Sequence, residues 1–275
     1  MRRTLAALMV MVAVPLAGAA QQDKAAPAGG GKTQVTWYGH AAFTATTPKG
    51  TVLAIDPWFS NPANKDGKAV PPDKIDFILV THGHSDHVGD AVALAKKTGA
   101  KFVGPFGLAQ ALMRAGYPMD PQSAMATAGD MGGTIELTDE VAVTLVPAFH
   151  SSGFDKGEQS PAEYAGNPVG FIIRVKGGPT IYHTGDTAPF SDIQYPAKRW
   201  APIDLMLACI GGHFTMDPVG AALMAGWVNP KQIVPMHFGT FPLLRGTPAQ
   251  LQQAIQKAGG KAKMTEMKVG ETRAF

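Results

Sequence analysis

The sequence predicts an α/β fold, on three observations. The chain has 275 residues, 45% of them apolar, which suffices for the core of one domain. Its 32 glycines and 22 prolines favour many strands joined by turns. The apolar run 75–80 is typical of a short buried strand, and segment 88–97 after it has apolar residues at helical spacing, with Gly99 as its end.

The first twenty residues are typical of a secretory signal peptide. Arg2 and Arg3 precede an apolar run over 5–16 that is too short to span a bilayer, and residues 17–19 match a small-residue cleavage pattern. We predict a signal peptide over 1–20, a flexible lead-in over 21–32 and one domain over 33–275. The protein is then expected in the periplasm or secreted, with no stable membrane anchor after signal removal. The alternative is an uncleaved N-terminal anchor.

The domain is predicted to begin with strands and helices in alternation. Alternating or continuous apolar residues predict the strands, and a glycine marks the end of each helix. The predicted elements are strands over 34–38, 51–55, 75–80 and 101–103, and helices over 88–97 and 108–115. The proline- and glycine-bearing loop 61–72 is expected to wall a pocket.

Two predicted hairpins come next, followed by strands and helices in alternation again. The predicted strands lie over 134–137, 141–146, 169–175, 180–183, 204–208 and 233–236, with a last strand near 268–269. One helix is expected to begin at Asp217, with Pro218 at its first position. Another begins at Thr247, where Gln250 completes a capping box. Loops 151–168 and 190–199 are also expected to wall the pocket.

Four residues that can bind metal fall within six positions after the strand over 75–80: His82, His84, Asp86 and His87. The chain has only eight histidines, so three in one loop is a concentration that chance rarely gives. An extended segment sends alternate side chains to one side, so His82 and His84 can bind one ion while Asp86 and His87 face a second. Imidazoles and a carboxylate suit zinc and similar metals. The alternative is a polar loop without metal.

Histidine or aspartate, which can bind metal, also follows the ends of other predicted strands. These positions are Asp56, His82, His150, Asp186, His213 and His237. Ligands in open α/β folds bind at the carboxyl ends of strands, so the recurrence indicates one shared site.

The stretch from His82 to His87 resembles the H-x-H-x-D-H signature of the metallo-β-lactamase superfamily. The resemblance implies a four-layer αββα sandwich and two divalent metal ions, zinc first, with manganese or iron as alternatives. It assigns His82, His84 and His150 to the first ion, Asp86, His87 and His237 to the second, and Asp186 to a bridge between them. The alternatives are a loop histidine at 150, a turn aspartate at 186 and a core histidine at 237.

Further segments resemble compact hydrolases of this superfamily related to L-ascorbate-6-phosphate lactonase. They include Gly39 with His40, Asp56 with Pro57, 182–187, 211–216 and 237–240. The resemblance implies that His40 lies near the metals and that the loop of His213 lies near the active site. In a mechanism that uses metal-activated water, either Asp86 or Asp186 is expected to hold and accept the proton. We therefore name Asp86, His40 and His213 as candidate catalytic residues; a structural role is the alternative for His40, and any role of His213 itself is open.

Two more residues are predicted to support the site. Asp56 is expected to hydrogen-bond a ligand histidine, with an ordinary turn residue as the alternative. His183 is expected to lie buried behind the ligands, with plain packing as its alternative.

These features predict a metal-dependent hydrolase, in which two metal ions activate water for attack on an ester, lactone, amide or phosphoester bond. The partner is a small-molecule substrate of unidentified structure, for which Lys156, Lys198 and Arg199 are candidate contacts to an anionic group. Without Arg2 and Arg3 the chain carries 22 basic and 21 acidic residues, a net charge of +1 that does not favour nucleic acid. The oligomeric state stays open. The alternatives are a non-catalytic metal-binding protein and an iron-dependent redox enzyme.

Overall fold

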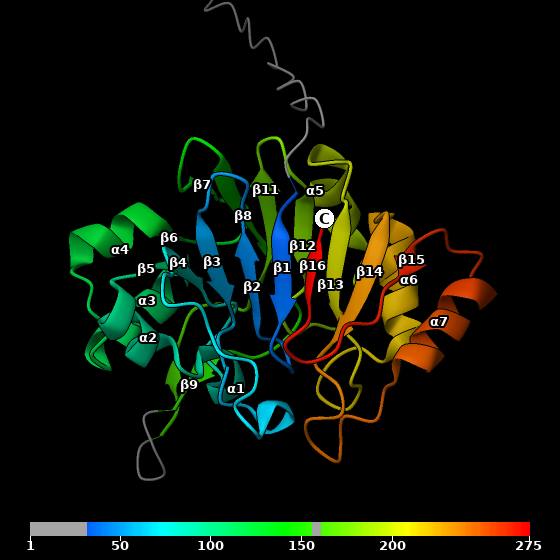
Figure 1. Ribbon diagram of the computed structural model, residues 1–275, viewed down its shortest axis with the longest axis horizontal. Helices are drawn as coiled ribbons and strands as arrows, with labels where there is room; N and C mark the ends of the chain where they lie inside the picture. Colours follow the sequence, from blue (N-terminus) through cyan, green and yellow to red (C-terminus); the bar gives the residue numbers. More distant parts are fainter. Residues whose placement is uncertain (1–31, 156–160) are drawn as a thin grey trace, which may run out of the picture.

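Two seven-stranded β-sheets pack face to face, and helices cover the outer face of each (Figure 1). The computed structural model describes residues 32–155 and 161–275. The four layers confirm the predicted αββα sandwich. The predicted signal peptide, and all but the last residue of the lead-in, lie outside the described residues.

The first sheet has the order β16-β1-β2-β3-β4-β5-β6. Its strands are β1 (Gln34–Trp37), β2 (Phe43–Thr46), β3 (Val52–Ile55), β4 (Phe77–Leu79), β5 (Lys101–Pro105), β6 (Ala128–Gly129) and β16 (Thr272–Ala274). Pairing is antiparallel from β16 to β3 and parallel from β3 to β6. Its outer face packs against α2 (Ala91–Thr98), α3 (Phe106–Arg114) and α4 (Pro121–Thr127).

The second sheet has the order β15-β14-β13-β12-β11-β8-β7. Its strands are β7 (Thr134–Glu136), β8 (Val141–Pro147), β11 (Val169–Val175), β12 (Thr180–His183), β13 (Leu205–Cys209), β14 (Gln232–Met236) and β15 (Lys263–Met264). The strands from β12 to β15 are parallel. Helices α5 (Gln194–Arg199), α6 (Pro218–Val228) and α7 (Pro248–Lys257) contribute side chains to the core on this side.

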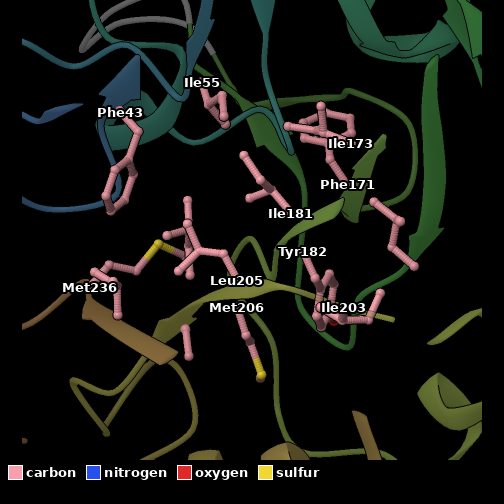
Figure 2. Packing of buried hydrophobic residues seen from close by; sticks show 14 of the residues in the cluster. Phe43, Ile55, Phe171, Ile173, Ile181, Tyr182, Ile203, Leu205, Met206 and Met236 are labelled. Carbon is pink, nitrogen blue, oxygen red and sulfur yellow. The ribbon is translucent and has the colours of Figure 1, made fainter. Parts of the chain in front are cut away.

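The main core fills the space between the two sheets (Figure 2). Phe43 from the first sheet and Ile181 and Leu205 from the second point into this space, whereas Tyr182 and Met206 lie on the opposite side of their strands. Both faces of the second sheet are therefore buried. This explains why its strands are continuous apolar runs rather than alternating ones.

The caps of α6 and α7 follow from local sequence. Asp217 accepts a hydrogen bond from the backbone N–H of Gly220, and Thr247 forms a capping box with Gln250, which confirms both predicted helix starts. Among residues 32–155 and 161–275, no helix combines the length and the apolar character that crossing a membrane requires.

The predicted helix over 88–97 is wrong at its start. The structure has a short α1 (Ser85–Val88), a break at Gly89 and Asp90, and then α2. Gly89 has φ of +42° and lies against Trp58, where a Cβ atom would come within 2.5 Å of the Trp58 Cα. The chain must break here because Trp58, far away in sequence, packs against this glycine.

Other differences lie where contacts distant in sequence decide the structure. The last strand is not at 268–269: a turn closed by the Glu271 N–H and the Lys268 carbonyl occupies that place, and β15 and β16 flank it. Strand β2 and helix α4 were not predicted. The supposed loops 151–168 and 190–199 contain the small pair β9 (Gly153–Phe154) and β10 (Glu163–Tyr164), and helix α5.

Candidate metal centre

The loops that follow β4, β8, β12 and β14 converge at one end of the sandwich and bring all seven predicted metal ligands together. Within each set, the potential ligand atoms lie within 4.8 Å of one another. What we call the first group consists of His82, His84 and His150. The second group consists of His40, Asp86, His87 and His237. A third set, His82, His87 and Asp186, joins the two.

Asp186 lies between the two groups. Its Oδ2 is 3.0 Å from His237 Nε2, 3.3 Å from His87 Nε2 and 3.6 Å from His150 Nε2. One carboxylate oxygen thus faces imidazoles of both groups. This placement suits the bridging role predicted for Asp186.

The centre contains buried polar atoms that have no hydrogen-bond partner among the described residues. They include His87 Nε2, His237 Nε2 and Asp186 Oδ1. Buried nitrogen and oxygen atoms are almost always paired, because an unpaired one costs about 1–3 kcal/mol. In the first group, His82 Nε2 and His84 Nδ1 face each other at 2.9 Å. Converging imidazoles and carboxylates fit divalent cations such as zinc.

Asp56 supports histidines of both groups. Its Oδ2 accepts a hydrogen bond from His87 Nδ1 at 2.7 Å and another from the Thr81 hydroxyl at 2.8 Å. Because that hydroxyl donates its only proton to Asp56, it accepts from His82 Nδ1 at 3.0 Å. Both imidazoles thereby turn their Nε2 atoms towards the centre. The predicted hydrogen bond from Asp56 to a histidine of the motif is confirmed, and the role of Thr81 was not predicted.

His40 is fully buried beside the second group. Its Nε2 is 3.1 Å from Asp86 Oδ2 and its Nδ1 is 3.0 Å from the Thr240 hydroxyl. Burial lowers the pKa of His40 to about 4, so the ring is neutral at pH 7. A neutral ring that donates to Asp86 accepts from Thr240. No role was predicted for Thr240, although it belongs to a segment that carries the resemblance.

Asp86 does not act as a helix cap. Helix α1 begins after His84, with no side-chain hydrogen bond at its cap, and Asp86 turns instead to His40 and His237. Burial alone would raise the pKa of Asp86, but His87, His237 and His40 outweigh it and hold the pKa far below its ordinary value. The carboxylate is therefore ionised at every ordinary pH.

The pKa values of the histidines differ between the groups. In the first group, burial lowers the pKa values of His82 and His150. In the second, burial would lower the pKa of His237, but Asp186 outweighs it and raises the pKa to about 9. The pKa of His87 is raised in the same way, by Asp186 and Asp56 against burial.

The loops of the centre carry backbone strain. Apart from glycines, five described residues have positive φ, and three of them, His40 (51°), Asp56 (42°) and His237 (56°), belong to the centre or support it. Such conformations cost on the order of 1–3 kcal/mol and cluster at functional sites. The His237 N–H donates to the His40 carbonyl, which fixes the two loops to each other.

The remaining predicted residues lie outside the ligand groups. His213 is exposed and lines a separate hollow of about 660 Å³ beside α6 and α7, so the structure does not bring it to the ligands. His183 accepts from the Gly185 N–H and donates to the Ala41 carbonyl, a buried link behind the centre that confirms the predicted position.

The predicted anion contacts Lys198 and Arg199 are wrong as residues of a pocket at the metal centre. They belong to α5, which lies at the end of the sandwich opposite α1 (Figure 1). Arg199 lies over the Trp200 ring, 4.9 Å from its centroid, and Arg174 lies over the same ring. Lys156 lies outside the described residues.

Comparison with known proteins agrees with this fold. Residues 34–237 match the model of the Beta-lactamase superfamily domain. A UPF0173 metal-dependent hydrolase from Anaeromyxobacter sp. (strain K) is 58% identical over 248 residues, which cover 89% of this chain and 88% of that protein. Another from Thermodesulfovibrio yellowstonii is 46% identical, over 88% of this chain and 92% of that protein.

A solved structure gives the same result. The metallo hydrolase from the archaeon Ignicoccus hospitalis KIN4/I has a TM-score of 0.74 and 34% identity, over 89% of this chain and 98% of that one. The chain therefore belongs to the metallo-β-lactamase superfamily and, within it, to the family of UPF0173 metal-dependent hydrolases.

Proposed function

We propose that this metal-dependent hydrolase uses two divalent ions, zinc first, to cleave an ester, lactone, amide or phosphoester bond of a small molecule. The observation that carries the proposal is the position of Asp186 Oδ2 within 3.0–3.6 Å of imidazole nitrogens from both ligand groups. The first group with Asp186 would hold one ion, and Asp86, His87 and His237 with Asp186 the other. A lactonase-like reaction is favoured by the resemblance of the His40 and His237 segments.

Bound ions would supply a water of lowered pKa and would polarise the oxygen of the attacked bond. The protein's own residues hold the rest of the arrangement. Asp86, ionised and fixed by His40 Nε2, is placed to hold and accept a proton during attack. Asp56 and Thr81 keep His87 and His82 in the tautomer that leaves Nε2 free.

The test combines metal content with turnover. Purified protein, supplemented with zinc, should hold about two ions per chain and hydrolyse at least one member of a panel of esters, lactones, amides and phosphoesters. Asp186→Ala should bind fewer than two ions and lose turnover. A stoichiometry that stays below one in the supplemented wild type would overturn the dinuclear proposal, and metal bound without any turnover would favour a binding protein or a redox enzyme.

We also propose that residues 1–20 direct export and that residues 33–275 function as one domain in the periplasm or outside the cell. The basic start, the apolar run and the small residues at 17–19 support this. Sequencing the N-terminus of the native protein should find Ala20 or Gln21 in the periplasmic or secreted fraction. Intact Met1 on cytoplasmic protein would contradict it.

A further inference from the structure

Two pairs of aromatic side chains lie on the loops that carry the ligand groups. Trp58 and Phe241 stack with their ring centroids 5.9 Å apart, and each meets the His40 ring edge-on, at 5.3 and 5.7 Å. Phe149 directly precedes His150 of the first group and packs on Phe190 at 5.0 Å. The Trp58–Phe241 pair therefore adjoins the second group, and the Phe149–Phe190 pair includes the chain neighbour of His150 in the first group.

Part of this aromatic surface is open to solvent although the backbone beneath it is fixed. Phe149 is 61% exposed and Phe241 is 37% exposed. The Phe149 N–H donates to the Thr187 hydroxyl, and its carbonyl accepts from the Ala188 N–H, so its loop is tied next to Asp186. An exposed large ring on a backbone fixed in this way is available to pack against an apolar group.

No described lysine or arginine forms an ion pair with the carboxylates of the centre. Within residues 32–155 and 161–275, Asp86 and Asp186 form ion pairs with histidines only. Arg245 turns its Nε to the Pro242 carbonyl and lines the separate hollow beside α6 and α7. Among the described residues, the ion pairs of the centre therefore supply no lysine or arginine that would bind the charged end of an anionic substrate.

Building on the hydrolase function proposed above, we infer that the substrate is a neutral ester or lactone with an apolar, ring-sized substituent. That substituent packs against Phe149 or against the Trp58–Phe241 pair, beside the bond that is cleaved. The rings thus select the substrate, whereas Asp86 and the ligand groups carry out the chemistry. A phosphorylated or carboxylated substrate is disfavoured.

The test uses three methyl esters that share a leaving group and differ only at one end. Methyl 3-phenylpropanoate, methyl propanoate and monomethyl succinate carry a phenyl group, a hydrogen and a carboxylate at the same carbon, and water cleaves each to an acid and methanol. We expect kcat/KM to be roughly tenfold higher for the phenyl ester than for methyl propanoate, because a partly open apolar site gains the lower end of the usual range. Monomethyl succinate should be the poorest substrate.

Variants assign this selectivity to residues. Either Phe149→Ala or Phe241→Ala, depending on which ring the substituent contacts, should lower the phenyl-to-hydrogen ratio of kcat/KM at least threefold. If the change occurs in Phe149→Ala, Phe149→Leu should keep more of the ratio. Met125→Ala is the matched control, because Met125 is a 73% exposed apolar residue on α4; it should leave the ratio unchanged. Equal rates for the three esters, or preference for the succinate ester, would overturn the inference while leaving the hydrolase function intact.

If none of the esters is cleaved, a binding experiment separates the inference about the apolar site from the proposal that the protein is an ester hydrolase. Calorimetric titration would then compare 3-phenylpropanamide, propanamide and succinamate. Binding of the phenyl amide roughly tenfold tighter than propanamide, lost in Phe149→Ala or Phe241→Ala, would support the apolar site although the ester hydrolase proposal had failed. Absence of this preference, or tighter binding of succinamate, would overturn the inference.

Discussion

The two ligand groups differ in charge and burial although they share Asp186. The first group is made of imidazoles only, and His84 and His150 are partly exposed. The second contains Asp86 beside His87 and His237, which are buried. Burial lowers the pKa values of His82 and His150 in the first group, whereas carboxylates raise those of His87 and His237 in the second, where the buried His40 is the only histidine with a lowered pKa. The first group is thus ready to bind metal at pH 7, while metal at the second must displace protons.

The largest expected effect comes from removing the charge that distinguishes the second group. Asp86→Asn keeps the shape of the side chain but removes an ionised proton acceptor, so turnover should fall on the order of 10²- to 10⁴-fold. Steady-state kinetics and metal analysis should show that the first group retains its ion. The matched control is Asp90→Asn in the same loop, where the carboxylate binds Ser60. Comparable losses in both variants would point to damage of the loop instead.

The raised pKa of the second group predicts how the stability of the metal-free protein depends on pH. Folded His237 keeps its proton up to about pH 9, whereas an unfolded histidine releases it near its ordinary value of 6.5. The raised pKa of His237 therefore adds its full contribution to the free energy of unfolding below pH 6.5, and this contribution disappears as the pH rises to 9. Denaturant titration should show the free energy of unfolding falling by on the order of 3 kcal/mol over this interval.

Two comparisons sharpen that prediction. His237→Gln should flatten the decline in the metal-free protein. The metal-loaded wild type should not show it, because metal and protons compete for the same nitrogens. A metal-free protein that became more stable between pH 6.5 and 9 would contradict the proposed difference between the groups.

Asp56 supports histidines of both ligand groups. Its substitution should weaken metal binding at both groups, but to different extents. Asp56→Asn removes the carboxylate oxygen that accepts from His87, and that also orients His82 through the Thr81 hydroxyl. Metal affinity should therefore fall about 10- to 100-fold. The loss should be greater for the ion of the second group, where the contact is direct. Thr81→Val, which removes only the link to His82, should affect the first group alone. Competition with a chelator measures both, and equal loss in the two variants would show that Asp56 has no separate effect on His87.

His40 tests whether the second group contains a residue that is no metal ligand. His40→Ala should lower turnover roughly tenfold, because Asp86 loses the donor that orients it, while two ions stay bound. Metal analysis separates the two roles. Loss of an ion in His40→Ala would make His40 a ligand, and unchanged kinetics would make it structural.

The smallest effect is expected at His213. It is exposed and outside both ligand groups, so His213→Ala should change kcat/KM less than about twofold, as surface substitutions generally do. A tenfold loss would return His213 to the active site and show that its loop moves when substrate binds.

The sequence allowed prediction of what is local. His82, His84, Asp86 and His87 are close in the chain, and their grouping follows from an extended segment that enters a helix. The distant ligands His150, Asp186 and His237 were predicted through resemblance, since no local rule relates loops so far apart. The helix caps at Asp217 and Thr247 were predictable because a cap depends on a few neighbouring residues.

What could not be predicted depends on approach between distant segments. The break at Gly89 follows from Trp58, and β16 exists only because β1 offers an edge to pair with. His213 shares with the ligands its position after a strand, yet its loop turns the side chain to another surface, with φ of 57°. A histidine or aspartate at the end of a strand was therefore necessary for predicting a metal ligand, but it was not sufficient.

The position of the single cysteine at the end of β13 determines the reactivity of its thiol. Cys209 is fully buried, and its thiol donates to the Thr187 carbonyl. Burial raises the pKa of the thiol to about 11, so hardly any thiolate exists at neutral pH. The thiolate is the form that oxidants, alkylating reagents and zinc attack or bind. The chain therefore offers no reactive thiol that would form mixed disulfides or bind metal in place of the centre. Treatment of the native protein with iodoacetamide should leave Cys209 unmodified and turnover unchanged.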